Sequence, residues 1–247
     1  MNIYLCKHHR SLGDYLYSFL NRFIPSIKIE DCPIPSYPDL ALKFAQIRVI
    51  NPDREGTNSE PLRPEINFEM RKITECYCGK GGVYSGNHYA LILRKHIPGQ
   101  FADLRSMPVL NTPEYLATFQ FPEMRWHLRY GIFSIPTLIS INGIIEAPAR
   151  PRGYYLKKVM GLDGGHNGRY LTHSDKRLSR ILAGILLQGL FYYRSGNPFC
   201  SDRNCSLYNS HWQEDLIRSQ RDDPHILCPH HTQMLTDINS GGIIRHA

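Results

Sequence analysis

The side chains with the clearest chemical potential lie in the last fifth of the chain, where three cysteines and a histidine form two short pairs. Four residues separate Cys200 from Cys205, and two residues separate Cys228 from His231. Zinc(II) binds four soft or borderline ligands in a tetrahedron, and two short pairs joined by a spacer supply that geometry. Four protein ligands leave no position for water, so we expect a structural rather than a catalytic zinc ion. His230 is an alternative fourth ligand, although the two-residue spacing favours His231.

The order of these ligands resembles the structural zinc site of the archaemetzincins, which are zinc peptidases. In that family a Cys-x4-Cys pair, a small residue, a large apolar residue, a spacer and a Cys-x2-Cys pair directly follow the catalytic segment HExxHxxGxxHC. Cys200 takes the place of the last cysteine of that segment, Leu207 that of the family's methionine, and His231 that of its final cysteine. The spacer from Leu207 to Cys228 is longer than in the family.

A wider stretch, residues 125–231, resembles an archaeal family that is classed as metallopeptidases and is itself similar to the archaemetzincins. Its most specific parts are residues 143–155 and 198–214. The resemblance implies an α/β fold, with a compact archaemetzincin-like (zincin-type) domain and an appended C-terminal zinc knuckle. The expected division of the chain is an α/β domain at 1–195, a zinc knuckle at 196–235 packed on the last long helix, and a tail at 236–247.

The catalytic half of the family pattern is missing from this chain. Counting back from Cys200, the positions of the three zinc histidines and the catalytic glutamate hold Gly189, Tyr193, Phe199 and Leu190, and only the family's glycine is matched, by Gly196. A zincin needs ligands that leave one metal position open and a carboxylate that accepts a proton from the bound water. The sequence therefore predicts a degenerate peptidase site, and the leading hypothesis is a non-catalytic relative that binds a peptide or protein.

Other side chains near the motif keep a second hypothesis open, a hydrolase with a relocated metal site. The candidates are Glu146, His166, His173 and His211. No pair of these histidines has the i, i+4 spacing that places two imidazoles on one helix face. His211 and Glu214 are three residues apart and would share a face if their segment is helical.

The seven cysteines are an odd number, so a complete set of disulfides would leave one thiol over. Three of them cluster at metal-ligand spacing, which favours thiolate ligation in a reducing compartment. Cys76 and Cys78 stand in a glycine-rich segment, and their role stays open between a turn and a second metal or redox site. The beginning of the chain shows no features of a signal peptide, so we expect a cytoplasmic protein.

The formal net charge of +7 and the pI of about 9.0 permit weak, non-specific binding to nucleic acid. The basic residues are scattered and form no run of five, which argues for a solvated surface. Arg150 and Arg152 stand in a proline-containing linker beside Tyr154 and Tyr155, and this is the other support for a third hypothesis, a nucleic-acid-associated zinc protein. The same linker can instead pack across a domain surface. No apolar stretch approaches the roughly 20 residues that a bilayer requires, so we expect no membrane partner.

The elements that position the candidate ligands follow from the apolar pattern. Residues 3–6, 12–23 and 27–29 are typical of a strand, a helix and a strand, which is how a layered α/β domain begins. A helix is predicted at 39–48, followed by a polar, proline-containing loop at 51–64.

The middle of the chain is expected to be mixed loop and helix up to about residue 130. A β-hairpin is then predicted at 137–146, because Asn142-Gly143 lies between two apolar runs and suits a type I′ turn. Ser174 or Asp175 can cap the last long helix, whose apolar positions run from Leu178 to Phe191.

Overall fold

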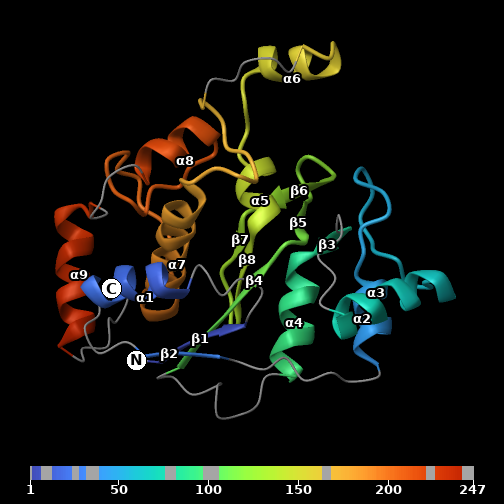
Figure 1. Ribbon diagram of the computed structural model, residues 1–247, viewed down its shortest axis with the longest axis horizontal. Coiled ribbons are helices and arrows are strands. Elements are labelled where there is room, and N and C mark those ends of the chain that lie inside the picture. The colour runs from blue at the N-terminus through green and yellow to red at the C-terminus, as the bar shows by residue number, and fades with distance from the viewer. Residues whose placement is uncertain are drawn as a thin grey trace. The chain divides into compact units, whose positions relative to one another are not determined.

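The computed structural model describes eight segments of the chain: 2–6, 13–23, 28–31, 39–75, 82–96, 106–162, 168–220 and 226–240 (Figure 1). The chain divides into two compact units. The first comprises Met1–Gly13 and Ser26–Gly143, and the second comprises Asp14–Pro25 and Ile144–Ala247. Strands and helices alternate in the first unit and helices dominate the second, so the predicted α/β class is confirmed.

A five-stranded sheet in the order β2-β1-β4-β8-β7 organises the first unit. Its strands are β1 (Asn2–Cys6), β2 (Lys28–Asp31), β4 (Ser106–Thr112), β7 (Gly131–Ile132) and β8 (Thr137–Ser140). The first four strands in the sheet order are parallel, and β7 pairs antiparallel with β8. Parallel neighbours need a long connection, and the chain between β1 and β2 contains α1 (Gly13–Phe23), as the sequence predicted.

A smaller sheet of three strands belongs to the same unit. Its order is β3-β5-β6, with β3 (Val83–Ser85) parallel to β5 (Tyr115–Gln120) and β5 antiparallel to β6 (Arg125–Arg129). Three helices complete the described part of this unit: α2 (Leu40–Gln46), α3 (Arg63–Glu75) and α4 (Gly86–His96).

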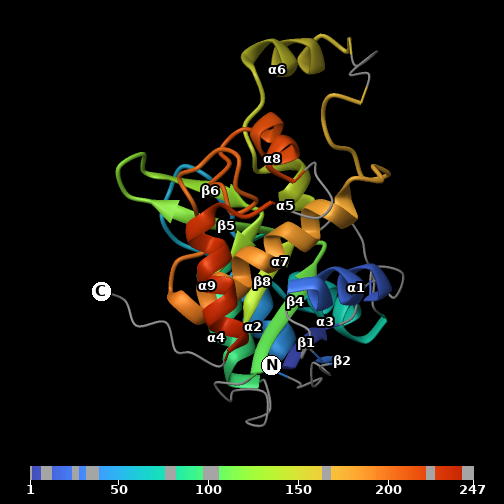
Figure 2. The same ribbon diagram turned by 90° about the vertical axis from the view of Figure 1, so that its left-hand side faces the viewer.

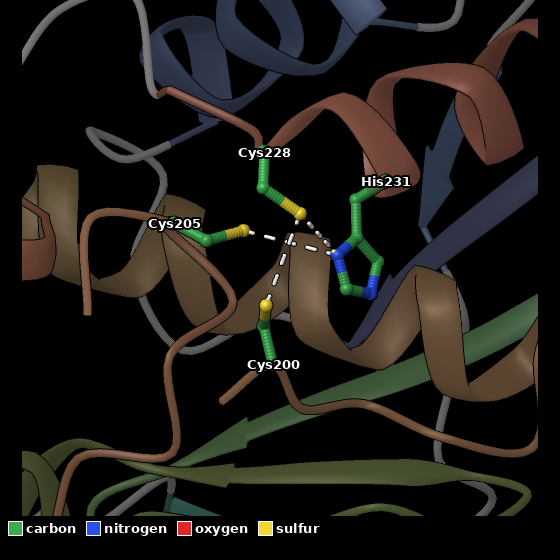
Figure 3. Close-up of side chains that lie close together, drawn as sticks. All are labelled: Cys200, Cys205, Cys228 and His231. Carbon is green, nitrogen blue, oxygen red and sulfur yellow. Dashed lines mark hydrogen bonds between the residues drawn. The ribbon is translucent and has the colours of Figure 1, made fainter. Parts of the chain in front are cut away.

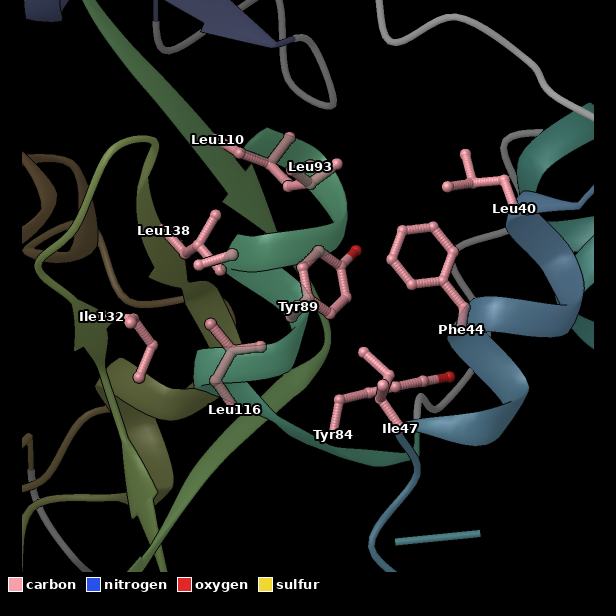
Figure 4. Packing of buried hydrophobic residues seen from close by; sticks show 11 residues of the cluster. Leu40, Phe44, Ile47, Tyr84, Tyr89, Leu93, Leu110, Leu116, Ile132 and Leu138 are labelled. Atoms are coloured by element: carbon pink, nitrogen blue, oxygen red, sulfur yellow. The ribbon is translucent and has the colours of Figure 1, made fainter. Parts of the chain in front are cut away.

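The core of the first unit joins its helices to both sheets (Figure 4). Phe44 of α2 faces Tyr89 of α4, with ring centroids 4.7 Å apart, and Tyr84 of β3 meets Tyr89 edge to face. Leu110, Leu116 and other strand residues close the other side of this cluster. Burial of these apolar side chains is the main force that holds the helices on the sheets.

The second unit is built around α7 (Leu178–Ser195), whose residues from Ile181 to Phe191 are all buried. The helix ends at Gly196, which has a φ of 76° and caps it in the left-handed conformation. The remaining helices of the unit are α6 (Arg152–Val159), α8 (Gln213–Ser219) and α9 (Pro229–Asn239), together with α1. Helices α7 and α9 lie side by side in both views (Figures 1 and 2), and the side-chain amide of Asn239 donates to the carbonyl of Phe23 at the end of α1.

The predicted hairpin around Asn142-Gly143 is wrong, because Ile141–Glu146 forms a short helix, α5. The Ser140 hydroxyl accepts the amide N–H of Gly143, which is how a serine caps a helix N-terminus. A Cβ atom on Gly143 would lie 2.3 Å from the carbonyl oxygen of Arg129. Gly143 is therefore needed for close backbone approach and not for a turn.

The expectation of mixed loop and helix before residue 130 is also wrong, since β4, β5 and β6 occupy 106–112, 115–120 and 125–129. The described residues 107–110 of β4 are all buried, so the strand lacks the alternation of apolar and polar residues that reveals a half-exposed strand.

Asp175 does not cap α7 directly. Its carboxylate accepts the N–H of Arg177, one residue before the helix begins.

The predicted boundary between residues 195 and 196 stays a prediction; the segment 196–235 lies within the second compact unit. Among the described residues, none of the helices combines the length and the apolar character needed to cross a bilayer.

Candidate metal centre

The first pair of candidate ligands lies on a closed loop that follows α7. The N–H of Cys200 donates to the carbonyl of Leu207 over 2.8 Å, and the N–H of Asn209 returns to the carbonyl of Cys200. Within the loop, the N–H of Cys205 donates to the carbonyl of Asp202. These backbone bonds turn Cys200 and Cys205 toward each other.

The second pair lies at the start of α9. Cys228 is the N-cap residue, Pro229 occupies the first turn, and His231 lies three residues after the cap. Proline suits this place because its fixed φ matches the first turn and its missing N–H would have had no helical partner. Residues three apart on a helix lie on one side, so Cys228 and His231 reach the same point.

The four side chains converge, and their ligand atoms all lie within 4.8 Å of one another (Figure 3). The sulfur atoms of Cys200 and Cys228 are 3.9 Å apart, and Nδ1 of His231 lies 3.1 Å from the sulfur of Cys228 and 4.0 Å from that of Cys205. A tetrahedral zinc ion with Zn–S bonds of about 2.3 Å separates its sulfur ligands by about 3.8 Å. The arrangement thus has the dimensions of a four-coordinate site for a divalent metal.

Burial sets the electrostatics of this cluster. It raises the pKa of Cys205 to about 12, raises that of Cys200, and lowers that of His231. Against this trend, the N–H of Asp202 donates to the sulfur of Cys200 over 3.3 Å and favours the thiolate. Burial alone favours neutral side chains, whereas a coordinated divalent cation stabilises thiolates outright.

The surroundings distinguish His231 from His230. His231 is 7% exposed and its ring meets that of Phe191 from α7 edge to face at 5.2 Å, whereas His230 is exposed. The geometry therefore selects His231 as the fourth candidate ligand. The supporting roles of Phe191 and of the Asp202 N–H were not predicted from the sequence, although a backbone donor two residues after a cysteine ligand is a local feature that spacing can suggest.

The other candidate residues do not assemble into a second site. In the part of the chain that the structure describes, Cys200, Cys205, Cys228 and His231 form the one group of three or more side chains that could hold a metal ion. Glu146 binds the buried Arg150 over 3.1 Å, and Glu214 binds Arg169 over 2.6 Å. His173 and His211 are exposed. His166, Cys76 and Cys78 lie outside the described residues.

The positions that the resemblance to archaemetzincins assigns to catalysis lie in α7 and in the segment after it. Gly189 and Leu190 are buried within α7, while Tyr193 and Phe199 are half-buried. Glycine, leucine and phenylalanine have no side-chain atom that binds zinc, and leucine cannot accept a proton.

Comparison with known proteins places the chain in a family. The model of the family described as "Probable metallopeptidase family (DUF6775)" matches residues 14–238. The chain belongs to this family. This membership confirms the resemblance to a metallopeptidase family that the sequence predicted. No curated protein matches the DUF6775 chain.

Two solved structures are similar to the DUF6775 chain over nearly its whole length. Archaemetzincin from Methanopyrus kandleri is 13% identical with a TM-score of 0.47, and the match covers 97% of this chain and 94% of that one. A zinc-dependent peptidase from Methanocorpusculum labreanum is 10% identical with a TM-score of 0.45, covering 95% and 98%. At these identities and TM-scores, neither structure indicates which residues of this chain bind a ligand or take part in catalysis.

Proposed function

We propose that this DUF6775 protein is a zinc-stabilised relative of the metallopeptidases that binds a peptide or protein without cleaving it. The observation that carries the zinc part is the convergence of Cys200, Cys205, Cys228 and His231. Three thiolates and one imidazole form a ligand set typical of structural zinc, and they leave no position for a reactive water. The ion would join the loop after α7 to the start of α9 and so stabilise the second unit.

The non-catalytic part rests on the composition of α7 and the segment after it. A metal-activated water requires an open coordination position, and peptide hydrolysis requires a general base beside it. Gly189, Leu190, Tyr193 and Phe199 supply neither at the positions where the archaemetzincin pattern has them. Peptide binding is the part of peptidase function that survives the loss of these groups, and the family's description as metallopeptidases supports a peptide or protein as the ligand.

The same family description favours a second candidate, hydrolysis at a relocated metal site that includes His166, His173, His211 or Glu146. The pairing of Glu146 with Arg150 argues against its participation, because a carboxylate held by an arginine is a poorer metal ligand.

Metal stoichiometry combined with a hydrolysis assay separates the two candidates. We expect one zinc per chain, no chelator-sensitive cleavage of a diverse fluorogenic peptide library, and retention of some of those peptides in a binding assay. Cys228→Ser should release the zinc. Two zinc ions per chain, with hydrolysis that survives Cys228→Ser and is lost in His173→Ala or His211→Ala, would establish the relocated site instead.

A further inference from the structure

A row of basic side chains follows β6, on the edge of the three-stranded sheet and far in sequence from the metal centre. Arg125, His127 and Arg129 alternate along the strand, so their side chains share one face of the sheet. Their cross-strand partners on that face are Gln120, Thr118 and Leu116. The row spans about 14 Å from the first Cα to the last, at about 3.4 Å per residue.

The arginines of this row have unusually few partners. Nε of Arg129 donates to the Thr118 hydroxyl over 2.7 Å, and Nε of Arg125 donates to Nε2 of His127 over 3.2 Å. In the described part of the chain, neither guanidinium has a carboxylate within ion-pairing distance, and the terminal nitrogens of both lack an acceptor. Arg129 is also half-buried, where a charge without a counter-ion is costly. An oxyanion bound to the guanidinium fork of Arg129 would offset that cost, and a second could bind the fork of Arg125.

His127 lies between the two arginines and adds a third donor. Because arginine can only donate, Nε2 of His127 must accept, which leaves the ring neutral with its proton on Nδ1. Burial and the charges of Arg125 and Arg129 lower the pKa of His127, consistent with a positive potential over this face. Among the described residues, the carboxylate of the half-exposed Glu123 lies 4.0 Å from the imidazole.

We propose that the row Arg125, His127 and Arg129 binds carboxylate-rich, extended peptide segments. A peptide in extended conformation repeats its side chains with the same period as β6, so acidic residues at positions i and i+4 would meet the two guanidinium forks. This inference rests on the proposed peptide-binding function and names its ligand class.

A nucleic acid strand suits this face less well. Single strands are held by stacking of bases on aromatic rings as well as by charge. Phe119 and Trp126 are a cross-strand pair on the opposite face, and their rings contact each other. Tyr115 alternates with Phe119 along β5, and the exposed Phe121 beyond the end of β5 contacts Phe119. The described face therefore offers two guanidinium groups, polar side chains and one imidazole, that of His127, but no Phe, Tyr or Trp ring for a base.

Fluorescence anisotropy with the full-length protein tests the proposal directly. The probes are a labelled peptide in which glutamate alternates with serine, the same peptide with glutamine in place of glutamate, and an oligouridylate of similar length. We expect the glutamate peptide to bind, and the variant Arg125→Gln/Arg129→Gln to weaken this binding about tenfold. Arg125→Lys/Arg129→Lys should restore only part of it, since lysine keeps the charge but loses the fork.

Arg71→Gln is the matched control, because Arg71 is an exposed arginine of α3 in the same unit, and it should change binding less than twofold. Zinc content and the circular dichroism spectrum report whether each variant is folded. If the double variant does not fold, the single variant Arg125→Gln is tested in its place, because Arg125 is exposed. Equal weakening by Arg71→Gln, equal binding of the glutamine peptide, or tighter binding of the oligouridylate would overturn the proposal. These outcomes leave the zinc and hydrolysis tests unaffected, so the two proposals fail separately.

Discussion

At the scale of single residues, the adjacent histidines of α9 form a matched pair for testing the metal centre. His231→Ala removes a buried ligand atom 3.1 Å from Cys228 and should lower zinc affinity by more than the 10- to 100-fold that is typical for loss of a supporting residue. His230→Ala changes an exposed neighbour and should leave zinc affinity unchanged. Competition with a chromophoric chelator measures both. Equal losses in the two variants would show that His231 is not a ligand.

Lys72 of α3 is a residue whose loss should be costly to the first unit. Its ammonium lies 2.6 Å from Glu114, 3.3 Å from Glu69 and 2.7 Å from the hydroxyl of Tyr84, and both carboxylates are buried. Lys72→Met leaves two buried carboxylates without a cation, so the free energy of unfolding should fall by about 3–5 kcal/mol in a urea titration. Lys43→Met, which removes an exposed lysine of α2, should leave the midpoint nearly unchanged.

Glu114 gives this cluster a pH dependence whose sign follows from its pKa. Burial raises the pKa of Glu114 above the ordinary 4.5, despite the opposing effect of Lys72. A carboxyl with a raised folded-state pKa contributes stability below pH 4.5 and loses it as the pH rises through the raised value. The wild type should therefore lose stability relative to Glu114→Gln as the pH rises above 4.5. Urea titrations of both proteins across this range measure the difference, and a constant difference would contradict the assignment.

At the scale of elements, glycines in two short helices should respond oppositely to the same change. Gly143→Ala in α5 would place Cβ 2.3 Å from the carbonyl oxygen of Arg129, and the resulting overpacking should destabilise the protein by about 1–3 kcal/mol. Gly153→Ala in α6 meets no atom within 4 Å and should be neutral or stabilising by up to about 1 kcal/mol, because alanine favours helix. Thermal unfolding of the two variants decides this, and equal shifts would show that the close approach at Gly143 relaxes at little cost.

At the scale of the whole molecule, metal removal should act on part of the chain. A chelator that removes the proposed zinc should make residues 196–235 sensitive to protease, because binding and local folding are coupled. The core of the first unit is built from other residues, so its amides should keep most of their protection in hydrogen exchange. Uniform loss of protection in both units would instead show that the zinc holds the whole molecule together.

The net charge of +7 does not by itself define a local binding site for nucleic acid. Weak, salt-sensitive binding of nucleic acid stays a prediction.

The sequence by itself determined the features that local chemistry encodes. Ligand type and spacing singled out Cys200, Cys205 and Cys228, and apolar periodicity predicted the strand–helix–strand beginning and the long helix that became α7. The absence of zincin ligands near Gly189 is likewise a property of the sequence alone. These inferences need only neighbouring residues and the period of a helix or strand.

Tertiary structure decided whatever depends on residues distant along the chain. It separated the buried His231 from the exposed His230, and it made a helix of Ile141–Glu146 because Ser140 caps that segment and the backbone at Arg129 lies against Gly143. It also brought Lys72 to Glu114, 42 positions away. Burial and backbone approach arise only when distant segments pack, so no local pattern records them.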